Sequence, residues 1–207
     1  SLCLVGSEMC IRDSNYTVTD GALTDTALLQ INVFGVNDTP VAQNDVGVIV
    51  EDGTLTVANG ANANETNDSG STFNATGEHS GDVIDTSSSS HTDSDADASA
   101  SLSITQIKKD GGSNSSVSSG SSYNSNGTSV TGTYGTLTIG ADGSYTYAAT
   151  ADAADGIADG ESVTDVFVYT LSDGTETTTA TITITILGAN DNPCLLYTSD
   201  AADERSG

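Results

Sequence analysis

Hydrophobic residues and threonines alternate strictly along residues 179–186. Ala180, Ile182, Ile184 and Ile186 fall on one side of an extended chain, and threonines occupy the positions between them. A period of two with β-branched residues is typical of a strand that buries one face and leaves the other in water. The pattern therefore predicts a half-buried β-strand, and we find no comparable helical period along the chain.

Three segments show this alternation on both sides of an Asp-Gly pair, a strong local signal for a tight hairpin turn. The predicted hairpins lie at 166–186, 135–147 and 46–57, with turns at Asp173-Gly174, Asp142-Gly143 and Asp52-Gly53. One more strand is expected at 101–107. Short strands joined by regular turn signals predict an all-β fold, an antiparallel sandwich of two sheets.

Two stretches interrupt this pattern. Residues 59–100 and 110–129 are rich in Ser, Asn, Gly and Asp and contain few apolar side chains. Such segments bury too little surface to offset the entropy lost on ordering. We therefore expect two long, largely mobile polar loops that are low-complexity insertions in the sandwich.

The chain also contains an internal repeat. Residues 16–40 align with residues 169–193 without a gap at an offset of 153, and twelve of the 25 positions are identical. Similarity at a fixed offset is the signature of a repeat array. We interpret residues 15–40 as the C-terminal part of a preceding repeat and residues 41–193 as one whole repeat.

The two ends contain cysteine and arginine, which are absent from residues 15–193. The cysteines lie at positions 3, 10 and 194, and the two arginines at positions 12 and 205. Residues 9–14 and 194–203 resemble in-frame translations of one transposon-type sequencing adapter, read in opposite orientations. A terminal disulfide is the alternative. We interpret residues 1–14 and 194–207 as adapter-derived and leave them out of the fold prediction.

Charge narrows the possible partners. The chain carries 29 acidic residues against four Lys and Arg, for a net charge of −25. Nucleic acids and anionic membranes attract proteins through Lys and Arg, so neither is expected as a partner. Membrane insertion is not expected either, because no apolar run approaches the roughly 18 residues of a membrane helix. The balance fits a self-repelling surface or carboxylates that bind cations.

Several stretches carry a family resemblance. The segment from Tyr134 to Pro193, with its Tyr-Thr-x-x-Asp-Gly stretch and its Gly-x-Asn-Asp-x-Pro ending, resembles the VCBS-type repeat of very large bacterial surface proteins. The start at 40–57 and the Asp-rich stretch at 81–107 are similar to earlier parts of that repeat. The resemblance implies tandem Ig-like or cadherin-like sandwiches, display outside the cell by RTX-type, type I-secreted adhesins, and calcium at the junctions between repeats.

Calcium takes roughly six to eight oxygen ligands from carboxylates, amides and carbonyls. The sequence offers such oxygens at the linkers, at an acidic turn and at an alternating Asp stretch. The candidate ligands are Asn37, Asp38, Glu51, Asp52, Asp93, Asp95, Asn190 and Asp191. By analogy with cadherin-like modules, Asn37 and Asp38 would share a site with Asp93 and Asp95, and Asp191 would share one with Glu51 and Asp52. The alternative is that these are ordinary turn residues.

Catalysis is not expected. The serine-rich stretches contain no base placed to activate a hydroxyl, and His79 and His91 fall in the polar segments. We predict a structural or adhesive repeat of a bacterial secreted or surface protein that spaces and stiffens a stalk. Its partners would be neighbouring repeats and cell-surface or polysaccharide ligands. The alternative is a carbohydrate-binding or accessory module of a secreted polysaccharide-degrading enzyme, for which Tyr123 is the one candidate contact.

Overall fold

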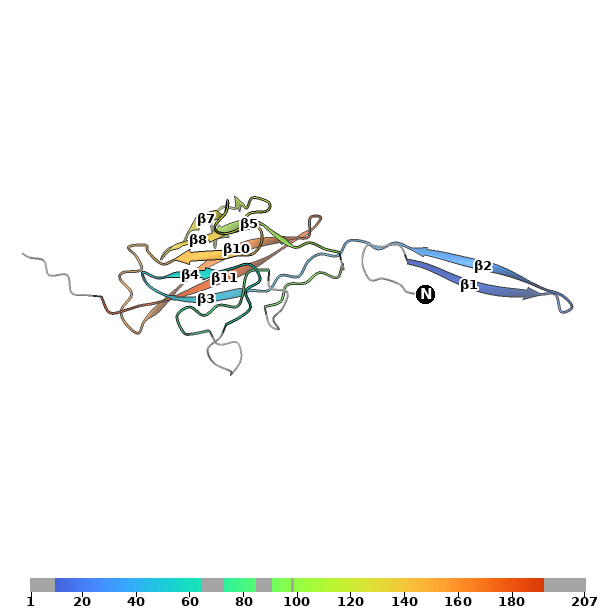
Figure 1. Ribbon diagram of the computed structural model, residues 1–207, viewed down its shortest axis with the longest axis horizontal. Helices are drawn as coiled ribbons and strands as arrows, with labels where there is room; N and C mark the ends of the chain where they lie inside the picture. The colour runs from blue at the N-terminus through green and yellow to red at the C-terminus, as the bar shows by residue number, and fades with distance from the viewer. Residues whose placement is uncertain (1–9, 65–72, 85–90, 98, 192–207) are drawn as a thin grey trace, which may run out of the picture.

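The computed structural model describes residues 10–64, 73–84, 91–97 and 99–191. In this described part the secondary structure consists of eleven strands and no helix, arranged in three sheets (Figure 1). A five-stranded sheet (β3-β11-β10-β5-β6) faces a four-stranded sheet (β4-β9-β8-β7), and β1 pairs with β2 alone. The all-β sandwich predicted from the alternation is confirmed.

The hairpin of β10 (Ser162–Ser172) and β11 (Thr177–Leu187) is the longest in the molecule. Its inward side chains are the alternate apolar residues of the sequence, and Ile182, Ile184 and Ile186 are fully buried. Gly174 has a φ of 98° in the turn, a backbone conformation that glycine adopts without steric cost. This predicted hairpin is confirmed.

The opposing sheet contains the second predicted hairpin, formed by β8 (Thr136–Ile139) and β9 (Tyr145–Ala148). Leu137, Ile139, Tyr145 and Tyr147 point inward and are fully buried. They belong to the same core cluster as the apolar face of β10 and β11. One continuous hydrophobic core therefore lies between the two sheets.

The third predicted hairpin, at 46–57, is wrong. Strand β3 (Asp45–Val50) pairs with β11 in one sheet, whereas β4 (Thr54–Val57) pairs with β9 in the other. The chain changes sheet between Glu51, whose N–H donates to Leu187 O at 2.9 Å, and Asp52, whose N–H donates to Ala149 O at 2.8 Å. The β3–β11 pairing is parallel, so the five-stranded sheet is mixed rather than purely antiparallel.

The polar stretches contribute more to the fold than expected. Residues 76–80 run along the free edge of β3, where the N–H of Val48 donates to Glu78 O at 2.8 Å. Val83 and Val117 enter the core cluster, which anchors each stretch with one apolar side chain.

Strands β5 (Ser103–Lys109), β6 (Ser115–Ser116) and β7 (Thr128–Thr131) extend the two sheets through the second polar stretch. The strand predicted at 101–107 is β5. The expectation of a largely mobile loop at 110–129 is therefore wrong. The parts of the first stretch at 65–72, 85–90 and 98 lie outside the described residues.

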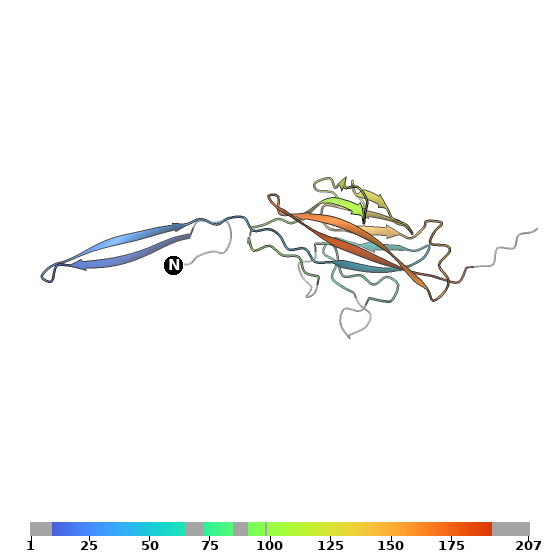
Figure 2. The same cartoon turned by 180° about the vertical axis from the view of Figure 1, so that it is seen from behind.

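Strands β1 (Cys10–Thr19) and β2 (Thr24–Val33) form a separate antiparallel hairpin. It extends away from the sandwich and is joined to it by residues 34–44 (Figures 1 and 2). Every residue of β2 is exposed. Strand β1 begins inside the segment 1–14 that we interpreted as adapter-derived, while residues 1–9 and 192–207 lie outside the described part.

Candidate functional site

The linker that leads into the sandwich is fastened at one end of the five-stranded sheet. The side-chain amide of Asn37 donates to Asp173 Oδ2 at 2.8 Å, in the β10–β11 turn. The hydroxyl of Thr39 donates to Glu176 in the same turn. The N–H of Asp38 donates to Asp97 Oδ2 at 2.9 Å. The linker is thus held between a hairpin turn and the Asp-rich loop.

The Asp-rich loop at 93–97 lies along the next part of the linker. Val41 and Ser94 exchange two backbone hydrogen bonds of 2.8 and 3.1 Å. Asp93 Oδ1 accepts the N–H of Gln43 at 2.8 Å, and Asp95 Oδ1 accepts the N–H of Asp97 at 2.7 Å. The structure therefore brings Asp93 and Asp95 next to the segment that carries Asn37 and Asp38.

Some carboxylate oxygens of this loop are not occupied by hydrogen bonds of the described fold. Asp93 and Asp97 are buried, and Asp95 is half-buried. Oδ2 of Asp95 is inaccessible to water and accepts no hydrogen bond from the residues that the structure describes, and the three carboxylates line one open pocket. A buried carboxylate oxygen without a donor is costly unless a cation or water meets it.

A second acidic group lies at the other end of the sheet, where the chain leaves the sandwich. Glu51 is buried, and its Oε1 accepts the N–H of Ala189. Its Oε2 is buried and has no hydrogen-bond partner within the described part of the chain. Asn190 and Asp191 follow directly and are exposed, and Asn190 Nδ2 lies 3.5 Å from Asp191 O. Glu51 therefore lies beside the outgoing linker.

Asp52, the remaining predicted ligand, is exposed in the turn that changes sheets and has a φ of 61°. The incoming and outgoing linkers lie at opposite ends of β11, whose eleven residues span roughly 36 Å at ~3.3 Å per residue. The eight predicted ligands thus form two separate groups. Within the described residues, no set of three or more His, Cys, Asp or Glu side chains is arranged to hold a metal ion.

Sequence reasoning omitted three carboxylates that contact the incoming linker, those of Asp97, Asp173 and Glu176. Asp97 was recognisable as the third member of the alternating Asp stretch. Asp173 was assigned only a turn role, which it also has: its Oδ1 accepts the N–H groups of Thr175 and Glu176. These bonds, with the one from Asn37, hold the pKa of Asp173 below its ordinary value, so it remains an anion beside the linker.

One buried carboxylate lies deeper, at the start of β3. Asp45 accepts hydrogen bonds from the hydroxyls of Ser80 and Tyr169 at 3.1 and 3.2 Å. Burial raises its pKa well above the ordinary value, and the nearby charge of Asp93 adds to the effect. Asp45 therefore ionises less readily than an ordinary aspartate, whereas Asp173 ionises more readily.

The family model for bacterial cadherin-like domains matches residues 67–188, which is more than half of the chain. The chain belongs to the bacterial cadherin-like domain family. A cadherin-like domain of this kind indicates an adhesive or structural module outside the cell. A comparison with curated proteins finds no match. Within the described residues there is no helix of the length and apolarity needed to cross a membrane.

Membership in this family bears on the two acidic groups. Cadherin-like domains commonly bind calcium, and both groups offer oxygen ligands only, as calcium prefers. The orphaned oxygens of Asp95 and Glu51 fit a cation, since each is buried and lacks a donor. Each group nevertheless provides few side-chain ligands, so either would need further oxygens from a neighbouring module.

Proposed function

We propose that this cadherin-like module is one repeat of a large bacterial secreted or surface protein, in which calcium at the linkers spaces and stiffens a stalk. The observation that supports it most is the pairing of each Asn-Asp linker with a carboxylate that has a buried, unbonded oxygen. Asp95 provides that oxygen at the incoming linker and Glu51 at the outgoing one. Type I secretion in the manner of RTX-type adhesins belongs to the same proposal.

The incoming group would consist of Asn37, Asp38, Asp93 and Asp95, with Asp97 fixing the linker backbone. It lacks an acidic turn from the module before it. The outgoing group would consist of Glu51, Asp52, Asn190 and Asp191, and it lacks an Asp-rich loop from the module after it. The two groups are complementary halves, so consecutive repeats would complete one site at every junction.

Calcium at such a junction would bind the ordered linker more tightly than a free one. Binding to one conformation stabilises that conformation by mass action. It would also offset the repulsion among carboxylates in a chain of net charge −25. We therefore propose that removing calcium loosens the angle between modules without unfolding each sandwich.

The test is a thermal melt of the chain and of a two-module tandem, each with calcium and with chelator. The tandem should gain several degrees in Tm with calcium and scatter X-rays as a longer rod. Asp95→Asn and Glu51→Gln should each reduce the gain, whereas Asp110→Asn, at the exposed position that follows β5, should not. An identical melt with and without calcium in both proteins would rule the calcium linker out.

We propose a non-enzymatic role, because the carboxylates that line the open pocket at 93–97 bond backbone N–H groups of the linker and the loop rather than a nucleophile. The carbohydrate-binding alternative rested on Tyr123. That residue is half-buried, so this loop offers a single, partly covered ring rather than an aromatic platform. We do not propose that alternative.

We also propose that the adapter-like ends are not native sequence. At the offset of 153, Asp13 and Ser14 stand where the complete repeat has Val166 and Phe167, and Phe167 is fully buried. The match to the repeat is continuous only from Tyr16 onwards. Amplifying the locus from source DNA tests this, and finding the same codons inside a longer gene would contradict it.

A further inference from the structure

The β1–β2 hairpin carries an apolar face on which none of the described residues packs. Tyr16 and Ile31 are 51% and 50% exposed, and their neighbours on that face are similar. The apolar residues of this face, which we call the open face, are Tyr16, Val18, Ala27, Leu29, Ile31 and Val33. The register also puts the polar residues Ser14 and Asp25 on this side of the hairpin, opposite Leu29 and Val18. A contiguous exposed apolar surface on a sheet marks an interaction site more often than a solvated one.

The hairpin has the same strand register as β10–β11. Tyr16 pairs with Ala27 in the first hairpin, and Tyr169 pairs with Ala180 in the second. Both pairs are related by the offset of 153 found in the sequence. Because a slip of one residue would exchange the two faces of a strand, equal register means that the corresponding side chains lie on corresponding faces.

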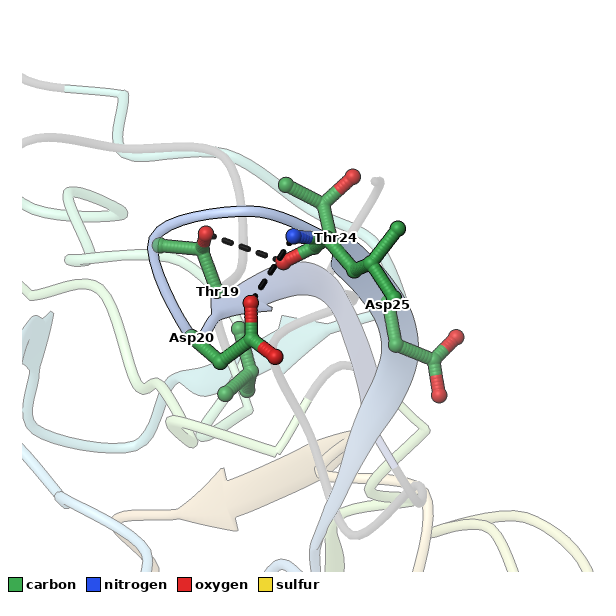
Figure 3. Close-up of a pocket in the computed structure, with 6 residues that line it drawn as sticks. Thr19, Asp20, Thr24 and Asp25 are labelled. Carbon is green, nitrogen blue, oxygen red and sulfur yellow. Dashed lines mark hydrogen bonds between the residues drawn. The ribbon is translucent and has the colours of Figure 1, made fainter.

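The two turns are also alike. Asp20 Oδ1 accepts the N–H groups of Ala22 and Leu23, and the hydroxyl of Thr19 donates to Leu23 O at 3.0 Å (Figure 3). Asp173 and Ser172 make the corresponding bonds in the second hairpin. The bonds from Leu23 and Ala22 hold the pKa of Asp20 below its ordinary value, as the equivalent bonds do for Asp173.

The counterparts of the open face show what covers such a surface. Tyr169, Leu171, Ile182, Ile184 and Ile186 are each 0% exposed. They share one core cluster with the inward residues of the four-stranded sheet. The covering surface is therefore an antiparallel sheet that presents Leu, Ile, Val and Tyr side chains.

We propose that the open face is a docking surface for the four-stranded sheet of another cadherin-like module, of the same chemistry as β4-β9-β8-β7. The inference rests on the repeat organisation proposed above but not on calcium. In this chain β10–β11 already packs against the four-stranded sheet, so the partner sheet comes from a further module. The docked segment runs from Tyr16 to Val33.

Docking would complete the hydrogen bonds of the hairpin as well as its packing. In the complete repeat β11 pairs with β3 and β10 pairs with β5, whereas among the described strands β1 and β2 pair only with each other. An isolated two-stranded hairpin is marginally stable in water. The partner module would therefore supply strands equivalent to β3 and β5 at the two open edges.

The test compares the present chain with one in which a second copy of residues 41–168 is joined directly to Tyr16. Hydrogen exchange is followed by mass spectrometry in the presence of chelator, which makes the result independent of calcium. Amides of residues 16–33 should exchange at least roughly 100-fold more slowly in the longer chain, since docking puts them in a cooperative unit. Exchange in residues 99–187 reports that the original module remains folded.

Two substitutions provide a matched control, since Ile31 and Leu28 are similarly exposed at 50% and 58%. Ile31 is on the open face, while Leu28 corresponds to the outward Thr181. Ile31→Asp should abolish the protection in the longer chain, and Leu28→Asp should keep it. Unchanged fast exchange at 16–33 with a folded original module would overturn the proposal. So would equal effects of the two substitutions, or concentration-dependent protection in the present chain, which would assign the face to a second copy.

Discussion

The hydroxyl oxygen of Tyr169 lies 3.2 Å from Oδ2 of Asp45, inside the sandwich. The same hydroxyl lies 2.7 Å from the carbonyl oxygen of Gln43, and it carries only one hydrogen. An ionised Asp45 therefore shares its donor with a backbone carbonyl, and Ser80 Oγ is its other contact. The contact ties the start of β3 to β10 at the cost of burying a carboxyl group that ionises poorly.

This arrangement predicts a pH-dependent stability. Burial, with the charges of Asp93 and Asp82, raises the pKa of Asp45 in the folded state. The stability that the neutral carboxyl group of Asp45 contributes is fully present below the pKa of Asp45 in the unfolded chain, near pH 4. It is lost as the pH rises through the pKa of Asp45 in the folded protein. Asp45→Asn should be more stable than the parent at pH 7.5, by about 1 kcal/mol or more, and close to it at pH 4.

Urea denaturation at the two pH values, with chelator present, checks this expectation. Asp155→Asn is the control, because Asp155 is exposed and the substitution should change stability within about ±0.5 kcal/mol at both values. If Asp45→Asn destabilised the protein more at pH 7.5 than at pH 4, Asp45 would be acting as a bound anion and the argument would fail.

A second prediction concerns Asp165, which holds the loop between β7 and β8. Its carboxylate accepts the N–H groups of Thr133 and Tyr134 at 2.7 and 2.9 Å and the hydroxyl of Tyr147 at 2.7 Å. Asp165→Leu leaves these donors without an acceptor, which should cost about 3 kcal/mol or more. Tyr147→Phe removes only one bond and should cost about 1 kcal/mol.

Denaturant melts of both variants give the comparison. Burial first, and then Asp165 itself, raises the pKa of the Tyr147 hydroxyl, so this group remains a donor throughout the pH range of the measurement. A loss for Asp165→Leu no larger than that for Tyr147→Phe would mean that the two backbone contacts contribute nothing.

Local pattern was sufficient for some elements and not for others. The Asp-Gly pairs at 142 and 173 close hairpins because the flanking alternation puts both strands in one sheet. The pair at 52 has the same signal, yet its strands diverge to different sheets. An Asp-Gly turn reverses the chain locally, but the pairing of β3 is decided by β11, more than 130 residues away, which no local period can reveal.

The candidate site likewise contains contacts that the sequence predicted and contacts that it did not. The proximity of Asp93 and Asp95 to the linker was expected from the resemblance, and the structure brings these segments together through Gln43 and Val41. The contact of Asn37 with Asp173 depends on where a hairpin turn ends in space, so the sequence did not predict it. The buried roles of Glu78 and Val83 were hidden because polar composition suggests a solvated loop unless single anchors are recognised.

A third prediction separates the fold role of Glu51 from its proposed cation role. Glu51 Oε1 accepts the N–H of Ala189, and an amide oxygen at the same place can do the same. With chelator, Glu51→Gln should therefore match or exceed the stability of the parent, since a buried charge is removed. With calcium in a two-module tandem it should lose most of the calcium-dependent rise in Tm.

Calorimetry of the tandem in both conditions makes the measurement, with Asp110→Asn as an exposed acidic control. A large loss of stability for Glu51→Gln in chelator would show that the carboxylate is needed by the fold itself. In that case its unbonded oxygen would no longer support a cation site.

The last prediction concerns Asp52, which combines a strained backbone with an exposed carboxylate. Its φ of 61° lies in the left-handed region, where a non-glycine residue is disfavoured and a β-branched one is strongly so. With chelator, Asp52→Gly should stabilise the module by up to about 1 kcal/mol, and Asp52→Val should destabilise it by about 1 to 3 kcal/mol.

Both variants remove the carboxylate, so they should change the calcium-dependent rise in Tm equally. Their stabilities in chelator should differ, because those depend on the backbone conformation at residue 52. Paired melts of each variant in the tandem therefore separate backbone strain from cation binding at a single residue. If Asp52→Gly keeps the full calcium-dependent rise in Tm, Asp52 is a turn residue alone, and the outgoing site relies on Glu51, Asn190 and Asp191. If both variants lose the rise to the same extent, the exposed side chain reaches the cation, and the change of sheet at 51–53 positions a ligand as well as a strand.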